Sequence, residues 1–259
     1  MAELPAGTEI LAQKNVADLN TTVTGDAFFA GKGVSESLFV LESTKKNTPQ
    51  ILLQNSNFTK NDITISGKNG GYLKTTSAFI KNNLTGSKGN DVIRFGKNST
   101  LKEGTIKLNK GADSISFGNQ STVNSGKINL GKGGDSITFK PRTTFKGKTT
   151  INLVPGGKDV VKFGKNPNFQ KGAKVVIRNF DKQDKLIVGK NTFTYKDIKN
   201  DAADEKMIVA DANGAVELYH NNSKKFETTS YGGIFGDESS SSVASPVRLS
   251  LGGTYHSSA

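Results

Sequence analysis

A segment of about 22 residues recurs through the middle of the chain, and this repeat restricts the possible folds more than any other feature. Four units match well: LTGSKGNDVIRF (84–95), IKLNKGADSISF (106–117), INLGKGGDSITF (128–139) and INLVPGGKDVVKF (151–163). A looser fifth, VVIRNFDKQDKLIV, covers 175–188. Their turn aspartates lie 22, 22, 24 and 25 residues apart, at Asp91, Asp113, Asp135, Asp159 and Asp184. The spacing predicts one structural unit per repeat.

Apolar and polar residues alternate on both sides of each turn. In the second unit, Ile106 and Leu108 precede the turn, and Ile115 and Phe117 follow it. Such alternation is typical of a half-buried strand. One unit is too short to bury its own apolar face, so we expect the units to stack and share a ladder of Ile, Leu and Phe. The sequence therefore predicts an all-β fold, a right-handed parallel β-solenoid (β-roll or β-helix) of about 22-residue coils.

The repeats divide the chain into four parts. We expect an N-terminal arm with capping strands at 1–61, solenoid repeats at 62–190 and a capping β-hairpin region at 191–236. The solenoid starts at 62 because DITISGKNGGYL (62–73) matches an imperfect coil. Two apolar runs in MIVADANGAVELYH (207–220) flank Asp211 to Gly214 and predict a hairpin there. The Ser-rich residues 237–259 predict an extended C-terminal tail.

The turn sequence GSKGNDVIRFG (86–96) resembles the Gly- and Asp-rich nonapeptide of the RTX (haemolysin-type calcium-binding) repeats. The resemblance covers about residues 84–220, because RTX proteins often end their last coil with a phrase like VVIRNFDKQDKLIV and a closing hairpin. It implies a β-roll in which calcium lies between successive turns. The ligands implied by position are Asp91, Asp113, Asp135 and Asp159.

The repeats also depart from the RTX pattern. Only one turn of each coil carries Gly and Asp, and residues 84–190 contain 21 Lys and Arg against seven Asp and Glu. Calcium-binding members of the family are strongly acidic. Carboxylates on stacked strands, ~4.8 Å apart, repel by roughly 3 kcal/mol at an effective dielectric of ~20. We therefore hypothesise that lysine replaces the ion, that the aspartates bind turn amides, and that the turns hold no calcium or other cofactor. The residues assigned to this structural turn are Gly89, Gly111, Gly133, Gly157, Lys88, Lys110 and Lys132.

Composition narrows the function classes. The absence of cysteine excludes disulfides and thiolate chemistry. The first residues show no signal-peptide pattern, and no run approaches the ~20 apolar residues of a membrane span. The net charge of +12 is carried mainly by lysine, with only four arginines. Arginine is the usual bidentate reader of bases and phosphates, so specific nucleic-acid binding is not favoured.

Catalytic patterns are scarce. His220 and His256 have no partner motif nearby, and GKINLGKG (126–133) lacks the Ser or Thr of a phosphate-binding P-loop. Asp181 and Asp184 could form an acidic pair, but a turn in the last coil explains them better. We expect no enzymatic activity.

The favoured function is a structural protein of a large assembly. The specific expectation is a virion component, either a capsid decoration (cement) protein or a tail-associated protein, located in the virion. Its expected partners are copies of itself and a shell or tail protein. Two alternatives stay open. One is a secreted RTX-like calcium-binding adhesin, extracellular or on the cell surface and exported by a type I system. The other is a Lys-rich polyanion-binding module.

Overall fold

A computed structural model describes residues 2–4, 9–12, 16–17, 20–23, 26–31, 34–43, 50–54, 57–196, 214–220, 223–229 and 232–235. Side-chain surroundings are described mainly for 34–43 and 57–196. Every complete element in these ranges is a β-strand, and Tyr195 and Lys196 are helical at the edge of the described residues. The predicted tail at 237–259 and the first half of the hairpin predicted at 207–220 lie outside the described residues.

The strands form three sheets, each made by stacking the equivalent strands of successive coils. Sheet A, in spatial order, contains β1 (Ala2–Leu4), β4 (Asn20–Val23), β7 (Leu38–Glu42), β10 (Asp62–Ser66), β13 (Asn83–Thr85), β16 (Thr105–Lys107), β19 (Lys127–Gly131), β22 (Lys148–Leu153), β25 (Ala173–Arg178), β28 (Gly214–His220), β29 (Ser223–Thr229) and β30 (Gly232–Phe235). Sheet B contains β2 (Glu9–Ala12), β5 (Asp26–Gly31), β8 (Gln50–Gln54), β11 (Tyr72–Thr75), β14 (Val92–Phe95), β17 (Ser114–Phe117), β20 (Ser136–Phe139), β23 (Val160–Phe163), β26 (Lys185–Val188) and β27 (Asn191–Thr194). Sheet C contains β3 (Val16–Ala17), β6 (Val34–Ser35), β9 (Asn57–Thr59), β12 (Ala78–Ile80), β15 (Thr100–Lys102), β18 (Thr122–Asn124), β21 (Thr144–Lys146) and β24 (Asn168–Phe169).

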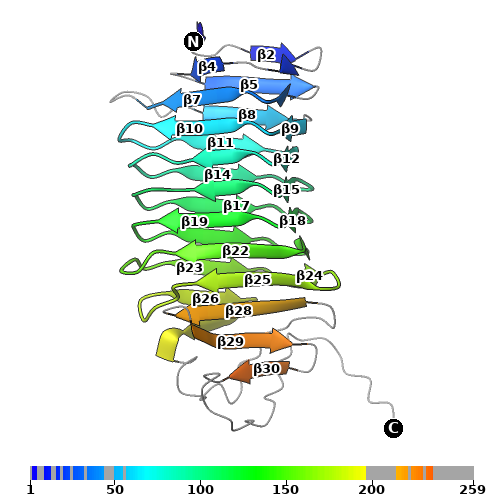
Figure 1. Ribbon diagram of the computed structural model, residues 1–259, viewed down its shortest axis with the longest axis vertical. Coiled ribbons are helices and arrows are strands. Elements are labelled where there is room, and N and C mark those ends of the chain that lie inside the picture. The colour runs from blue at the N-terminus through cyan, green and yellow to red at the C-terminus, as the bar shows by residue number, and fades with distance from the viewer. Residues whose placement is uncertain are drawn as a thin grey trace.

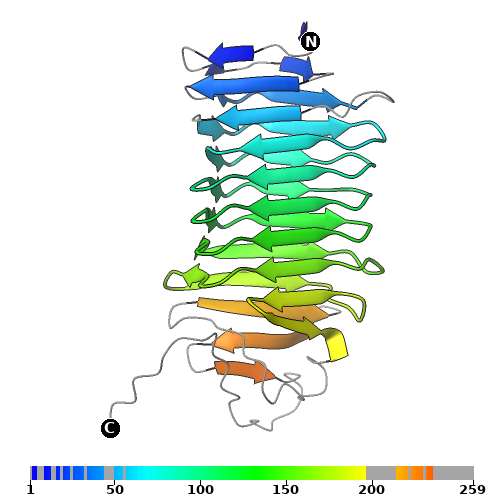
Figure 2. The same cartoon turned by 180° about the vertical axis from the view of Figure 1, so that it is seen from behind.

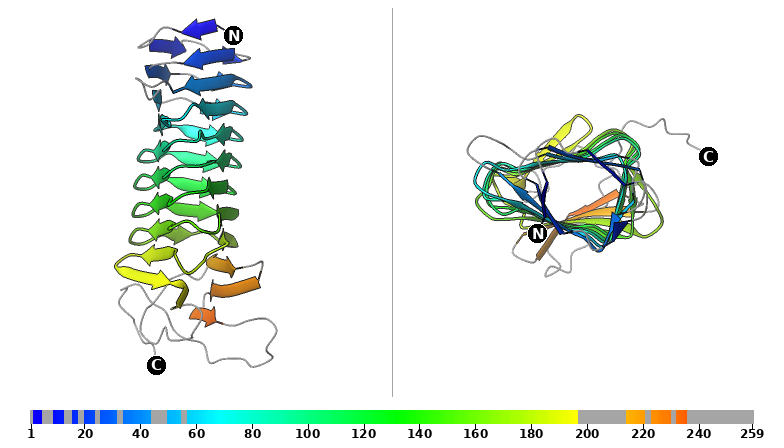
Figure 3. Two further views of the ribbon diagram at one scale, coloured as in Figure 1. Left: turned by 90° about the vertical axis from the view of Figure 1, so that its left-hand side faces the viewer. Right: turned by 90° about the horizontal axis from the view of Figure 1, so that it is seen from above.

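The predicted parallel β-solenoid is confirmed. Each coil passes through one strand of sheet A, one of sheet B and one of sheet C before the next begins, and equivalent strands pair in parallel. The pairing keeps repeat positions in register, so Ile115 lies between Ile93 and Ile137. The coils stack along the long axis in Figures 1 and 2, and the view along that axis in Figure 3 shows them superimposed around one outline.

The three sheets also continue on the N-terminal side of residue 62. Strand β10 pairs in parallel with β7, β7 with β4, and β4 with β1. The expected boundary between a capping arm and the solenoid therefore does not coincide with any change in sheet topology. The early coils were not predicted from the sequence because they lack the Gly-Asp turn that marks the later ones.

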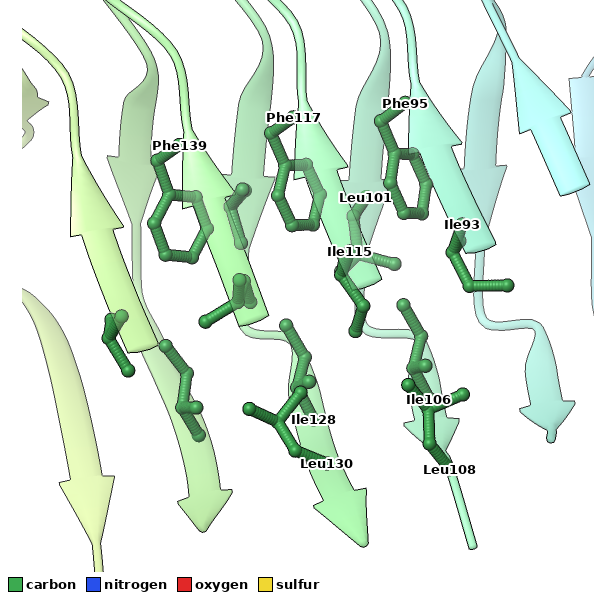
Figure 4. Close-up of a cluster of buried hydrophobic side chains, with 14 of the residues drawn as sticks. Ile93, Phe95, Leu101, Ile106, Leu108, Ile115, Phe117, Ile128, Leu130 and Phe139 are labelled. Atoms are coloured by element: carbon green, nitrogen blue, oxygen red, sulfur yellow. The ribbon is translucent and has the colours of Figure 1, made fainter. Parts of the chain in front are cut away.

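The interior is filled by apolar side chains stacked in rows, one residue of each row per coil (Figure 4). In sheet B the rings of Phe95, Phe117, Phe139 and Phe163 stack with centroids 4.5, 5.1 and 5.0 Å apart. Aromatic pairs at these separations add stability beyond the area they bury. Isoleucine and leucine form further rows, so each coil buries its apolar face against its neighbours, as the alternation predicts.

The C-terminal end of the solenoid changes from parallel to antiparallel pairing. Strand β28 pairs in parallel with β25, and β29 and β30 then extend sheet A in antiparallel fashion. Strand β27 folds back on β26 in sheet B. Strands β28 and β29 form an antiparallel hairpin, whereas the first strand of the hairpin predicted around Asp211 to Gly214 lies outside the described residues.

Candidate functional site

The turn that leads from sheet A to sheet B carries the acidic side chains of the repeat. In each coil from 84 onward, one aspartate lies immediately before the sheet B strand, as Asp91 does before β14. These side chains are at most 2% exposed and stack along the solenoid in a row, which we term the aspartate ladder: Asp91, Asp113, Asp135, Asp159 and Asp184. The sequence predicted the row, and the structure places it inside the turn.

Backbone amides connect the rungs of the aspartate ladder. The N–H of Asp91 donates to Oδ1 of Asp113 at 2.7 Å, and the next three links measure 2.8, 2.9 and 3.0 Å. At the N-terminal end, Oδ1 of Asp91 accepts the N–H of Gly71 at 2.8 Å. Each carboxyl therefore satisfies a buried amide of the preceding coil, which would otherwise be costly to leave unpaired.

The second carboxyl oxygen behaves differently at the ends and in the middle of the aspartate ladder. Oδ2 of Asp91 accepts the N–H of Ser87 at 2.7 Å, and Oδ2 of Asp184 accepts the N–H of Asp181 at 2.7 Å. The Oδ2 atoms of the three middle rungs are buried without a hydrogen-bond partner in the protein, namely those of Asp113, Asp135 and Asp159. For Asp159 the residue at the Ser87 position is Pro155, which has no N–H to donate.

This environment favours the neutral carboxyl. Burial raises the pKa of Asp113 to about 7; the hydrogen bond from Asp91 opposes the rise, and the charges of Asp91 and Asp135 add to it. Burial likewise raises the pKa of Asp159 to about 7 and that of Asp184 to about 6. The pKa values of Asp91 and Asp135 are also raised, again chiefly by burial. A protonated carboxyl still accepts an amide through Oδ1 while avoiding the cost of a buried charge.

The repeated glycine of the turn has a steric cause. Gly89, Gly111, Gly133 and Gly157 stack on one another from coil to coil, with backbone against backbone. A Cβ on Gly133, whose φ is +149°, would overlap the carbonyl oxygen of Gly111, and a Cβ on Gly157 would overlap that of Gly133. The predicted structural glycines therefore lie where neighbouring turns approach most closely.

The turn lysines do not meet the aspartates. Lys88, Lys110 and Lys132 are exposed, and in residues 57–196 none of them forms an ion pair with a carboxyl of the aspartate ladder. The aspartates lie on the inner side of the turn, whereas the lysine side chains are on the outer side. In residues 57–196 the expected replacement of the ion by lysine is therefore not seen as ion pairs, and it stays a prediction. Burial raises the pKa values of these carboxyls and so favours their protonated form.

The carboxyl oxygens are poorly placed for the calcium that the RTX resemblance implies. Calcium requires six to eight oxygen ligands. Each Oδ1 in the aspartate ladder already accepts an amide, and from Asp91 to Asp159 each coil offers a single acidic side chain at the turn. Within the described residues, no group of three or more His, Cys, Asp and Glu side chains is arranged to hold a metal. Metal-free turns remain a prediction.

A second ladder, which the sequence reading missed, lies at the corner between sheets C and A. The N–H of Asn61 donates to Oδ1 of Asn82 at 2.7 Å, the same link that joins the aspartates. Both asparagines are fully buried, and their Nδ2 groups donate to backbone carbonyls. Here the oxygen of a neutral side-chain amide, in place of a carboxyl oxygen, accepts the backbone N–H of the preceding coil. In the sequence this link shows only as two asparagines 21 residues apart, because only two coils carry an asparagine at this position.

The third corner, between sheets B and C, uses hydroxyl groups. Ser99, Ser121 and Thr143 donate to the carbonyls of Gly96, Gly118 and Lys140 at 2.7 to 2.8 Å, closing the turn at the same place in successive coils. The residue before each has positive φ, as at Gln120 (61°). All three corners are thus stabilised by internal polar contacts.

Where the structure describes them, the other candidates for chemistry belong to different elements of the fold. His220 ends β28, and His256 lies outside the described residues. Asp181 accepts the N–H groups of Gly156 and Gln183 and so shapes the last turn. The P-loop-like segment 126–133 contains strand β19.

Comparison with models of protein families, with curated proteins and with solved structures gave no match. No helix among the described residues has the length and apolar character to cross a membrane.

Proposed function

We propose that this protein is a non-enzymatic structural component of a large assembly, specifically a virion protein that decorates or cements the capsid or associates with the tail. Its partners are copies of itself and a shell or tail protein. We further propose that its repeat is a degenerate RTX repeat, in which the turn is kept and the ion is lost.

The observation that carries the proposal is the internal use of the acidic side chains. Five of the seven Asp and Glu residues between 84 and 190 belong to the aspartate ladder and bind backbone amides inside the solenoid. Carboxylates that act in general acid–base chemistry must reach a substrate, but these are at most 2% exposed. Their arrangement supports a role in holding coils together.

A continuous row of stacked phenylalanines supports the same role. The coils share one apolar interior from residue 34 to residue 193. Because each coil contacts only its neighbours, stability is distributed along the axis and the lateral faces remain available for contacts. A rod with regular side faces suits repeated contact with a lattice.

The test is to locate the protein in its native source. Particles are separated from free protein on a density gradient, and antibodies against the chain, with gold labelling, show whether it lies on regularly spaced positions of a particle. The proposal expects co-sedimentation in a fixed copy number. Recovery of the protein only in free form in the medium, dependent on residues 238–259, would refute it and support the type I-secreted adhesin.

A further inference from the structure

The fold separates the two signs of charge. Between residues 84 and 190, the only acids outside the aspartate ladder are Glu103 and Asp181. None of the 21 Lys and Arg residues of that stretch is buried in the way the ladder aspartates are. Glu103 already pairs with Lys81 and Lys102, at 3.4 and 4.0 Å. The solenoid therefore presents a more basic exterior than its composition suggests.

One part of this exterior is hollowed. A groove of about 370 Å³ crosses three neighbouring strands of sheet A, β16, β19 and β22. It is lined by Thr105, Ile106, Lys107, Lys127, Ile128, Asn129, Thr150 and Asn152. We term it the sheet A groove. Its volume falls within the range of small-ligand sites, about 300 to 1,000 Å³. The three strands belong to successive coils, so the groove runs along the axis of the solenoid.

The polar groups of the sheet A groove are mainly hydrogen-bond donors. Lys107 and Lys127 are exposed, and an ammonium group has donors and no acceptor. The amide oxygen of Asn129 already accepts the N–H of Gly131 at 3.0 Å, and that of Asn152 accepts Nδ2 of Asn179 at 2.7 Å. Both asparagines therefore offer Nδ2 to a ligand.

A local irregularity contributes to this arrangement. The pairing of β19 with β22 shifts register between Asn129 and Gly131, which has a φ of +87°. Such a bulge re-aims neighbouring side chains and recurs beside binding sites. It also provides the amide that fixes Asn129.

We infer that the sheet A groove binds an acidic polysaccharide. A ligand rich in acceptors and negative charge complements lysines and oriented amide donors, and no acidic side chain occurs in β13, β16, β19, β22 or β25. The threonine hydroxyls of Thr105 and Thr150 suit sugar hydroxyl groups, since they both donate and accept. The inference is independent of the assembly role.

The lining favours a sugar acid over a nucleic acid. Binding of single strands uses aromatic platforms on which bases stack, and phosphate and base recognition favours the guanidinium fork of arginine. The eight lining residues include neither an aromatic residue nor an arginine.

The test is a titration of the full chain with a fluorescently labelled polyuronate, followed by anisotropy, with neutral dextran and single-stranded DNA as comparison polymers. Lys107→Gln combined with Lys127→Gln is expected to weaken polyuronate binding about tenfold or more, because two charge-assisted contacts are lost. The matched control, Lys88→Gln with Lys110→Gln, makes the same charge change at the turn between sheets A and B. It is expected to change affinity less than about twofold, since these lysines lie outside the groove.

A second pair of variants separates site geometry from overall charge. Asn129→Asp keeps the oxygen that accepts the Gly131 amide but replaces the Nδ2 donor, so it is expected to weaken binding while leaving the melting temperature close to that of the unaltered chain. Asn124→Asp adds the same charge on sheet C and is expected to have little effect. Equal weakening by groove and control variants, equal or tighter binding of single-stranded DNA, or no binding of polyuronate would each overturn the inference.

Discussion

Raising the pH should destabilise this protein over a range in which many proteins gain stability. The cause is the aspartate ladder. Asp113 has its pKa raised from 3.8 to about 7 in the folded chain, and Asp159 has its pKa raised equally. Between pH 4 and 7 the folded protein therefore keeps protons that the unfolded chain has released. Because the folded state binds more protons, the free energy of unfolding must fall as the pH rises through this window.

The size of the effect follows from the same pKa values. One such carboxyl contributes its full stability below pH 3.8 and loses it as the pH rises to about 7. Each pH unit corresponds to about 1.4 kcal/mol, so Asp113 alone accounts for ~4 kcal/mol of the decline. The loss levels off above pH 7, where both states are ionised.

Asp113→Asn isolates this contribution. The amide keeps the oxygen that accepts the Asp91 amide, and Asn82 shows that an asparagine fits the equivalent link at another corner. Urea denaturation of both proteins from pH 4 to 8 gives the difference in unfolding free energy at each pH. The variant is expected to be similar to the unaltered chain near pH 4 and to gain on it, by up to ~4 kcal/mol, towards pH 8.

Asp62→Asn is the matched control, because Asp62 is exposed on β10 and lies outside the aspartate ladder. It should show no comparable pH-dependent gain. A constant difference between Asp113→Asn and the unaltered chain across the whole pH range would refute the reasoning, because it would mean that Asp113 ionises normally in the folded state.

Three further predictions concern the turns and the core. Gly133→Ala should lower the free energy of unfolding by more than about 1 kcal/mol in thermal or urea melts, whereas Gly134→Ala, whose Cβ would meet nothing closer than 3.6 Å, should be nearly neutral; equal effects would contradict the close-stacking explanation. Phe117→Ala should cost about 3 to 5 kcal/mol, since its fully buried ring stacks on both neighbours, while Ser116→Ala on the outer face should cost little; a small loss for Phe117→Ala would indicate a loosely packed row. Calcium chloride should leave the melting temperature unchanged and give no heat of tight binding in calorimetry, because each Oδ1 in the aspartate ladder already accepts an amide; a clear rise with stoichiometric heat would show that the turns still bind the ion.

The sequence was sufficient to predict the coil because its strongest signals are local and repeated. Alternation around Ile115 and Phe117 identifies the inner face of a strand, and the 22-residue spacing of Asp91, Asp113 and Asp135 sets the register between coils. Both signals are contained within short segments, and each coil of the stack repeats them.

The side on which a polar group lies was harder to predict. Lys110 and Asp113 are three residues apart in one turn, and nothing in their spacing reveals that one points outward and the other inward. The turn conformation decides this, and positive φ at Gly111 is part of that conformation. The Asn61–Asn82 link was missed for a related reason, because its meaning depends on a close approach between residues of different coils.

The inward placement of the aspartates also explains how so basic a chain can use an acidic motif. A row of ionised carboxylates ~4.8 Å apart would need a bound cation or a parallel row of positive charge. A row of protonated carboxyls needs neither, because it supplies the same acceptor to each amide without the repulsion. Because the aspartates are enclosed in the turn, the lysines outside have few acidic partners and are available to negatively charged ligands. The buried ladder and the basic exterior are therefore linked, because protonated rungs add no negative charge to the rod, whereas ionised rungs would repel one another and weaken the stack.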